Sequence, residues 1–251
     1  MSSRSPAPSE DMARLRAAIV AAGRRLGARG LIAAGEGNIS VRTPDQRLLI
    51  TATGLRKDEL APADLLVVDA RAGEAAPPSD PGIRPSSDIA IHRAIYAARP
   101  NVLAVAHAHL PAAMALTLAG EVPDPAFLPE TAVLLPSLPF VPYAAAGSEE
   151  LAAAIAAALT HGQAPLPGAA LLERHGAVAV GEGASHGAAA DPVAAIREAL
   201  DRLELVEVLC RTWRDALLVQ AAATGLGARA ILRPPSASPG SPASGRRRSH
   251  T

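Results

Sequence analysis

Residues 102–109 read V-L-A-V-A-H-A-H, an apolar run that ends in two histidines with one alanine between them. The apolar, partly β-branched part up to His107 predicts a buried β-strand. Side chains two residues apart in a strand project to the same face, so His107 and His109 are expected to lie together. Two imidazoles on one face can bind one divalent cation. The alternative is that both are ordinary polar residues at the end of a strand.

Helical and strand-like patterns alternate on both sides of this run, which predicts an α/β protein. Pro100 ends the helix before it, and Ser86 or Ser87 is the expected N-cap of that helix. A turn is predicted over residues 37–40 and a loop over residues 77–85. The predicted helices cover residues 11–29, 88–98, 111–118, 148–159 and 192–223, and the predicted strands cover 48–51, 65–68, 102–107, 170–172 and 177–180, with a further strand opening at Val41.

Composition divides the chain into one domain and two tails. Residues 10–227 contain enough apolar side chains for one globular domain of the 251-residue chain. Residues 1–9 and 228–251 are rich in Ser, Pro and Arg and are predicted to be disordered. Arginines interrupt the first alanine-rich segment, which therefore does not look like a signal peptide. Apolar runs are too short for a membrane span.

Charge and rare residues exclude several functions. The 24 basic residues balance 24 acidic ones, and Trp, Tyr and Phe together number only five, so a nucleic-acid surface is not expected. Cys210 is the only cysteine, which excludes a disulfide framework and a thiolate metal cluster and is typical of a reducing compartment. We therefore expect a cytoplasmic protein that binds neither nucleic acid nor membrane.

A third histidine extends the possible metal site. His175 lies in the tight turn of residues 174–176 between two apolar strands. Three neutral imidazoles with an open position are typical of catalytic zinc. The other histidines have no indicated role and are interpreted as ordinary polar residues: His92, His161, His186 and His250.

Three short polar segments follow predicted strands or precede a helix. Residues 37–40, Thr53-Gly54 and Ser86-Ser87 offer the backbone N–H groups and small donors that bind phosphate. Ordinary turns and caps use the same residues. Asp88 follows the serine pair, where it either complements the helix dipole or acts as a general acid/base or additional metal ligand.

Taken in order, these motifs resemble the class II aldolase/adducin family over about residues 11–222. The resemblance implies a three-layer α/β/α fold with a largely antiparallel central sheet. It also implies a homotetramer with active sites at subunit interfaces. The motifs are A-G-E-G-N-I-S (34–40), T-A-T-G (51–54), P-S-S-D (85–88), H-A-H (107–109), P-F-V-P-Y-A-A-A-G-S-E-E-L (139–151) and E-R-H-G-A-V-A-V-G (173–181).

The resemblance also implies roles for individual residues. Asp88 occupies the position of the catalytic acid/base, where aldolases usually carry glutamate and aspartate is similar to the epimerase branch. Glu130 is a second acid/base candidate, with helix capping as the alternative. By the same resemblance His107, His109 and His175 are zinc ligands, and Gly37, Asn38, Thr53, Gly54, Ser86 and Ser87 form the phosphate pocket of the substrate.

The implied function is a metal-dependent lyase that cleaves a phosphorylated ketose through a zinc-stabilised enediolate. Mn²⁺, Co²⁺ or Fe²⁺ could replace Zn²⁺ on three histidines. A Schiff-base route is not expected, because the only lysine, Lys57, sits in a charged turn where desolvation is unfavourable. The open alternatives are a 4-epimerase or decarboxylase of the same fold and an adducin-like module without catalysis. Residues 182–191 form a longer link than the family usually has.

Overall fold

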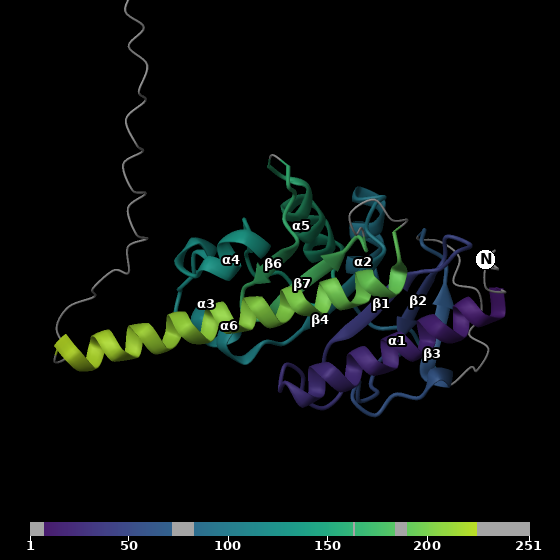
Figure 1. Ribbon diagram of the computed structural model, residues 1–251, viewed down its shortest axis with the longest axis horizontal. Coiled ribbons are helices and arrows are strands. Elements are labelled where there is room, and N and C mark those ends of the chain that lie inside the picture. The colour runs from purple at the N-terminus through teal and green to yellow at the C-terminus, as the bar shows by residue number, and fades with distance from the viewer. Residues whose placement is uncertain (1–7, 72–82, 163, 184–189, 225–251) are drawn as a thin grey trace, which may run out of the picture.

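The computed structural model describes residues 8–71, 83–162, 164–183 and 190–224. Helices and strands alternate along it, which confirms the α/β class (Figure 1). The elements are α1 (Pro8–Ala28), β1 (Asn38–Arg42), β2 (Leu48–Thr51), η1 (Pro62–Asp64), β3 (Leu65–Val68), α2 (Ile89–Ala98), β4 (Ala104–Ala108), α3 (Pro111–Leu118), η2 (Pro125–Phe127), α4 (Pro129–Leu134), β5 (Phe140–Val141), α5 (Glu149–Thr160), β6 (Ala169–Leu172), β7 (Gly176–Gly181) and α6 (Pro192–Thr224).

The described strands form one sheet in the order β3-β2-β1-β4-β7-β6-β5. Neighbouring strands are antiparallel from β3 through to β6. Only the short β5 pairs in parallel with β6, so the sheet is mixed. The strand that ends in the two histidines, β4, lies in the middle of the order between β1 and β7.

Helices cover both faces of this sheet. Alternate residues of β4 divide between the faces: Ala104 and Ala106 join the core with α1 and α6, whereas Val105 joins the core with α2 and α5. Both faces of the central strands β4 and β7 are buried, so apart from His107 their residues are apolar or glycine. The arrangement is the expected three-layer α/β/α sandwich.

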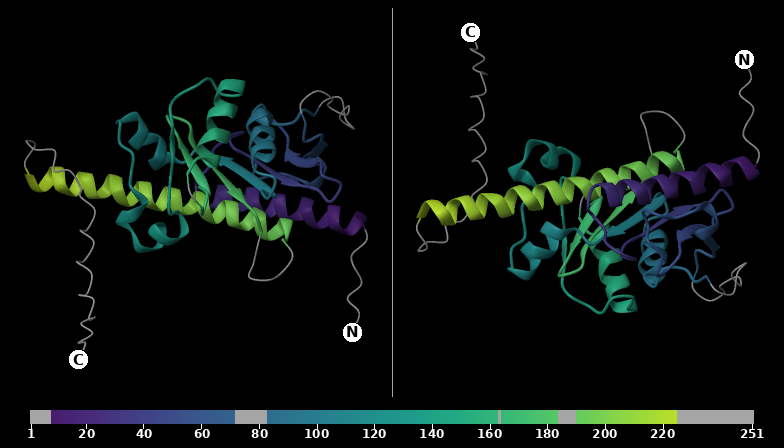
Figure 2. Two further views of the ribbon diagram at one scale, coloured as in Figure 1. Left: turned by 90° about the horizontal axis from the view of Figure 1, so that it is seen from above. Right: turned by 90° about the horizontal axis from the view of Figure 1, so that it is seen from below.

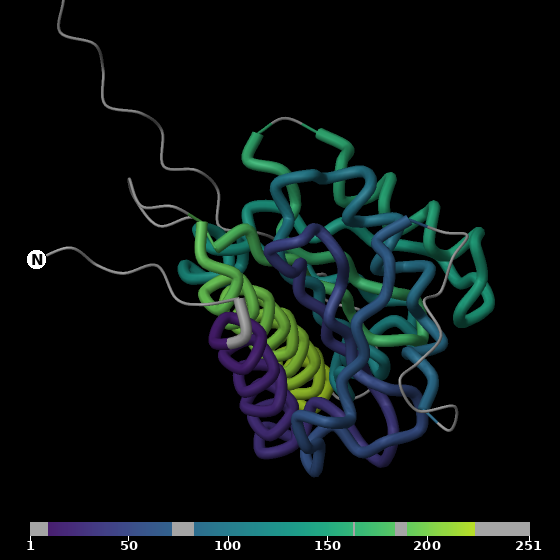
Figure 3. The backbone as a smooth tube through the Cα atoms, turned by 90° about the vertical axis from the view of Figure 1, so that its right-hand side faces the viewer, coloured from purple at the N-terminus to yellow at the C-terminus, as the bar shows by residue number. Residues whose placement is uncertain are grey.

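The two long helices α1 and α6 lie side by side on one face (Figure 3). The C-terminal part of α6 extends past the sheet and past α3 and α4, as Figures 1 and 2 show from different sides. In the described residues, no helix combines the length and the apolar character that a membrane span requires.

The first strand was predicted to begin too late. Asn38, Ile39 and Ser40 belong to β1, so the predicted turn over residues 37–40 is wrong from Asn38 onward. The Asn38 and Ser40 side chains are buried and point toward α2, where polar partners receive them. Tertiary hydrogen bonds therefore override the turn preference of asparagine and serine.

One short α-helix and one short strand were not predicted at all, nor were the 3-10 helices η1 and η2. The six-residue α4 and the two-residue β5 lie in a proline-rich segment, where the sequence pattern is too short to have a period. Several expectations concern residues outside the described ones: both predicted tails apart from residues 8 and 9, most of the predicted loop 77–85, and the middle of the link 182–191.

Candidate metal centre and active site

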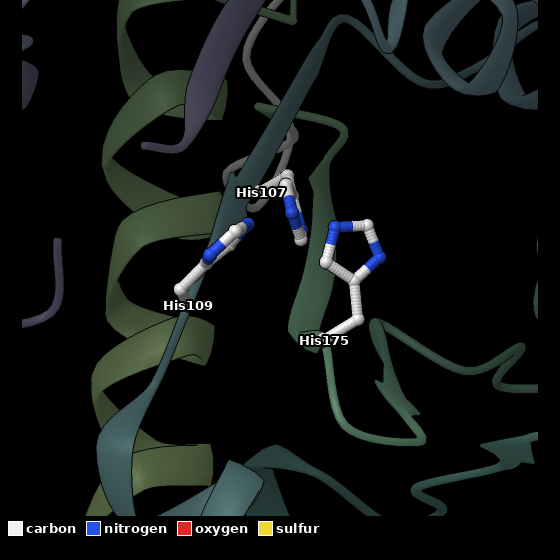
Figure 4. A group of neighbouring side chains, drawn as sticks. All are labelled: His107, His109 and His175. Atoms are coloured by element: carbon white, nitrogen blue, oxygen red, sulfur yellow. The ribbon is translucent and has the colours of Figure 1, made fainter. Parts of the chain in front are cut away.

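Three histidine side chains converge where β4 ends and β7 begins (Figure 4). His107 lies in β4, His109 follows two residues later, and His175 is the last residue of the turn before β7. Each ring offers one nitrogen as a ligand atom, and these three nitrogens all lie within 4.8 Å of one another. The ring centroids are 4.7 to 5.0 Å apart. The predicted convergence of these three residues is therefore confirmed, and it suits three ligands of one divalent cation.

The orientation of His107 leaves one nitrogen without a partner. Nδ1 lies 3.0 Å from the Ala177 carbonyl oxygen, which can only accept, so Nδ1 carries the hydrogen. The buried Nε2 has no hydrogen-bond partner in the described structure and holds the lone pair. Burial and the neighbouring imidazoles of His175 and His109 hold the pKa of His107 well below its usual value. A neutral imidazole with a free nitrogen aimed at two others is a donor set that fits a divalent metal.

His109 has an acidic neighbour, Glu36, that could not be predicted from the sequence. Glu36 places Oε1 3.4 Å from His109 Nδ1. Its other oxygen accepts a hydrogen bond from the backbone N–H of Ala33 at 3.0 Å, which holds the side chain in place. A carboxylate on one nitrogen of a histidine favours metal ligation by the other. The only signal in the sequence was an acidic residue inside a glycine-rich turn.

His175 is placed by a turn that requires glycine after it. Gly176 has φ +97°, and a Cβ there would collide with the Ala108 carbonyl oxygen. The absence of a side chain at Gly176 lets the β6–β7 turn approach the end of β4. Burial lowers the pKa of His175, and the nearby Asp88 carboxylate acts in the opposite direction.

A polar cavity of about 170 Å³ opens beside the histidines. A larger apolar hollow of about 720 Å³, between residues 136–140 and the end of α5, contains none of the predicted site residues. Gly54 is not among the residues that line the polar cavity in the described structure. The predicted residues that do line it are Gly37, Asn38, Thr53, Ser86, Ser87, Asp88, His109 and His175.

Asp88 is the N-cap residue of α2, so the prediction of Ser86 or Ser87 as the N-cap is wrong. The Asp88 side chain nevertheless makes no capping hydrogen bond. Its Oδ2 accepts a hydrogen bond from Asn38 Nδ2 at 2.8 Å instead. Asp88 is 7% exposed and lines the cavity. This orientation makes it available for chemistry rather than for capping.

Lys57 is buried, contrary to the expectation of a solvated charged turn. Its residue is 1% exposed, and Nζ donates to the carbonyl oxygens of Gly35 at 2.9 Å and Leu55 at 2.6 Å. Desolvation lowers its pKa, and Lys57 lines the cavity. The neighbouring Arg56 and Glu59 remain exposed, so the charge of the turn was a poor guide to this one side chain.

Glu130 and the histidines outside the proposed metal site differ in burial and in position. Glu130 lies exposed on α4 and is not among the described residues that line the cavity. His92 is fully buried and contacts Asn38, whereas His161 is exposed at the end of α5. His186 and His250 lie outside the described residues.

Comparisons with known proteins find a family model, sequence relatives and solved structures that this chain resembles. Residues 17–214 match the family model described as Class II Aldolase and Adducin N-terminal domain. A 5-methylthioribulose-1-phosphate/5-deoxyribulose-1-phosphate aldolase of Rhodospirillum rubrum is 34% identical over 203 residues, 80% of each chain. The L-fuculose-1-phosphate aldolase structure from Thermus thermophilus is 31% identical, with a TM-score of 0.68 over 86% of this chain and 99% of that one.

A further relative has a different activity in its name. A methylthioribulose-1-phosphate dehydratase of Granulibacter bethesdensis is 44% identical over 101 residues, which is 40% of this chain. The match spans 45% of that relative's length.

Proposed function

The chain belongs to the class II aldolase and adducin family, and from this premise we propose that it is a metal-dependent lyase that cleaves a phosphorylated ketose by a retro-aldol reaction. The convergence of His107, His109 and His175 beside a cavity that contains a carboxylate carries the proposal. A non-catalytic module has no need for three buried or half-buried imidazoles around one point.

The three imidazoles are the proposed ligands of a divalent cation. Zinc is the expected metal, with manganese, cobalt and iron as alternatives, because three histidines select weakly among them. When bound, such a cation supplies the Lewis acidity that lowers the free energy of an enediolate. Ala177 and Glu36 hold the outer nitrogens of His107 and His109, which keeps both rings oriented.

The remaining polar residues of the cavity bind and orient the substrate in this proposal. Asn38, Thr53, Ser86 and Ser87 provide hydrogen-bond donors for the phosphate, and Gly37 lets the backbone approach. A Cβ at Gly37 would lie 2.9 Å from the His107 carbonyl oxygen, so a larger residue would push the turn away from the histidines. Lys57 adds the positive charge that favours an anion.

Asp88 is the proposed proton carrier. Its carboxylate accepts the proton of the C4 hydroxyl while the C3–C4 bond breaks, and the bonding pair passes to C3 as the enediolate forms. Asp88 then returns the proton to C3, which gives dihydroxyacetone phosphate and an aldehyde. Glu130 keeps only the role of a second acid/base candidate supplied from another subunit, because it lies outside the cavity of its own chain.

Dehydration is the second candidate function. The 44% identical relative is a methylthioribulose-1-phosphate dehydratase, and the 34% identical relative is an aldolase for the same sugar phosphate. Both reactions leave an electron pair on C3, next to the C2 carbonyl: dehydration by loss of the C3 proton, and aldol cleavage by breakage of the C3–C4 bond. The two activities differ in whether a C–C bond or a C–O bond breaks.

The test is an assay of purified protein on a panel of ketose 1-phosphates. The panel includes 5-methylthioribulose, 5-deoxyribulose and fuculose 1-phosphates, and both dihydroxyacetone phosphate and loss of water are measured. We expect dihydroxyacetone phosphate, activity lost with a chelator, and activity restored by a divalent metal. Loss of water without C–C cleavage would support the dehydratase. Chelator-resistant turnover with borohydride trapping of substrate on Lys57 would overturn the metal-dependent mechanism.

We also propose a cytoplasmic homotetramer with active sites at subunit interfaces. Large apolar side chains are exposed on neighbouring helices: Val133 and Leu134 on α4, and Leu218 and Val219 on α6. Exposed apolar residues on neighbouring elements are typical of an interface. Light scattering should therefore give four chains per particle, and Leu218→Asp should yield smaller particles. A monomeric wild type would contradict the proposal.

A further inference from the structure

A buried chain of hydrogen bonds connects helix α2 to the carboxylate in the cavity. Tyr96 Oη lies 2.9 Å from Ser40 Oγ, which lies 2.7 Å from His92 Nδ1. His92 Nε2 lies 2.6 Å from Asn38 Oδ1. Asn38 Nδ2 donates to Asp88 Oδ2 at 2.8 Å. All five residues are buried, and His92 has no exposed surface.

The chemistry of these groups permits one direction of donation. An ionised Asp88 only accepts, so Asn38 presents its NH₂ group to Asp88 and its carbonyl oxygen to His92. His92 must then carry its hydrogen on Nε2. Burial lowers the pKa of His92 to about 4, so the ring is neutral near pH 7 and Nδ1 accepts from Ser40. Ser40 in turn accepts from Tyr96.

The position of Asn38 makes its orientation important. Asn38 lies in β1 directly opposite His107 in β4, and its side chain lines the cavity. The two ends of an amide have nearly the same shape, so packing alone does not fix which end faces Asp88. A flipped amide would place its carbonyl oxygen against the carboxylate, where the two oxygens repel each other.

We propose that His92 is a positioning residue: its Nε2–H holds the Asn38 amide with the NH₂ group on Asp88, and so fixes the direction of the carboxylate in the cavity. The donor at Nε2 is the essential feature, because it binds the amide oxygen at the buried end and so favours the same orientation that Asp88 favours at the other end. The inference rests on the proposed function for its predicted effect on kcat. The tautomer of the His92 ring can be measured whether or not the protein is active.

Two substitutions at His92 separate the two ring nitrogens. His92→Gln keeps an N–H donor near the place of Nε2 and loses the acceptor for Ser40. His92→Asn keeps an acceptor near the place of Nδ1 and loses the donor to Asn38. Tyr96→Phe is the matched control, because it removes a hydrogen bond from the same buried chain without touching Asn38 or Asp88.

The kinetic measurement uses the metal-loaded full chain, with metal content and unfolding temperature determined for each variant. We expect His92→Asn to lower kcat by about 10-fold or more at unchanged metal content, since a misdirected group near the reacting atoms costs rate. His92→Gln should recover most of the wild-type kcat, and Tyr96→Phe should stay within about 3-fold of wild type. Equal losses in His92→Asn and His92→Gln, or in His92→Asn and Tyr96→Phe, would mean that His92 acts only in stability.

The spectroscopic measurement is nitrogen NMR of ¹⁵N-histidine-labelled protein at pH 7, with the His92 signals assigned by their absence in His92→Gln. We expect the Nε2–H tautomer, and an Nδ1–H tautomer would overturn the inference. If the wild type turns over no member of the ketose 1-phosphate panel, the proposed function fails, and the tautomer alone decides the role of His92. An active wild type with an Nδ1–H ring rejects the inference and leaves the proposed function standing.

Discussion

The Asp88 carboxylate carries the proton in the proposed reaction, and its surroundings separate that role from capping. Asp88→Asn keeps the size and polarity of the side chain, and asparagine is as good an N-cap. We expect the free energy of unfolding to change by at most about 1 kcal/mol. An amide takes up no proton, so kcat should fall by roughly 100-fold or more. Steady-state kinetics, denaturant unfolding and metal analysis of the same preparation check this.

Asp88→Glu tests whether the shorter side chain is required at this position. Higher C–C cleavage in Asp88→Glu would mean that the cavity accommodates the longer carboxylate of the aldolases. Unchanged turnover in Asp88→Asn would remove Asp88 from the mechanism and leave Glu130 as the remaining carboxylate among the predicted residues.

Glu36 lines the cavity and faces His109, so we expect it to act on the metal through that histidine. Glu36→Gln removes the charge from the group that faces His109 Nδ1. We expect metal affinity to fall by about 10-fold, the lower end of the usual effect of such outer partners. Titration against a competing chelator measures it. Glu149→Gln, an equal charge change in the exposed first turn of α5, is the control and should leave the affinity unchanged.

At the scale of elements, the β6–β7 turn positions His175 against β4. Gly176→Ala adds a Cβ at φ +97° that collides with the Ala108 carbonyl oxygen. Backbone strain and overpacking together should reduce the free energy of unfolding by roughly 2–4 kcal/mol. Metal affinity should fall as well, because the turn must shift.

Gly120→Ala is the matched control for this substitution. Gly120 also has a positive φ, +74°, but a Cβ there would meet nothing within 4 Å. We expect Gly120→Ala to lower the free energy of unfolding by only about 1 kcal/mol and to leave the metal affinity unchanged. Equal losses in the two variants, measured by urea unfolding, would mean that the close approach to Ala108 contributes nothing.

Elements with a strong local pattern could be predicted from the sequence. The limits of β2, β3 and α3 agree with those expected, because apolar runs and prolines define them. The start of β1 could not be predicted, because Asn38 and Ser40 are turn residues by preference and strand residues only through contacts with α2. The burial of Lys57 likewise depends on carbonyl acceptors that the local sequence does not reveal.

At the scale of the whole molecule, sheet order explains why distant residues meet. β1, β4 and β7 are neighbours, so Asn38, His107 and His175 directly before β7 lie together although the chain separates them widely. Motif order in the sequence identified the histidines and the polar segments. It did not identify His92 or Glu36, because their roles depend on which strand lies beside which helix and turn.

The same buried network makes the stability of the whole fold depend on pH. His92 has a pKa of about 4 in the folded protein, lowered from 6.5 by burial. Above about pH 6.5 the ring is neutral in both states and contributes no pH dependence. Between about pH 6.5 and 4 the unfolded chain binds a proton there and the folded chain does not, so stability falls as the pH falls.

The loss of unfolding free energy due to His92 approaches about 3 kcal/mol by pH 4, because the pKa differs by about 2.5 units between the two states and each unit corresponds to about 1.36 kcal/mol. The lowered pKa values of His107 and His175 act in the same direction.

Urea unfolding of chelator-treated protein at pH 7 and pH 5 should therefore show lower stability at pH 5. His92→Gln should lose less stability over this interval than wild type, whereas Tyr96→Phe, which keeps the imidazole, should follow wild type. An equal slope in His92→Gln and wild type would mean that His92 takes up its proton in the folded state as readily as in the unfolded chain.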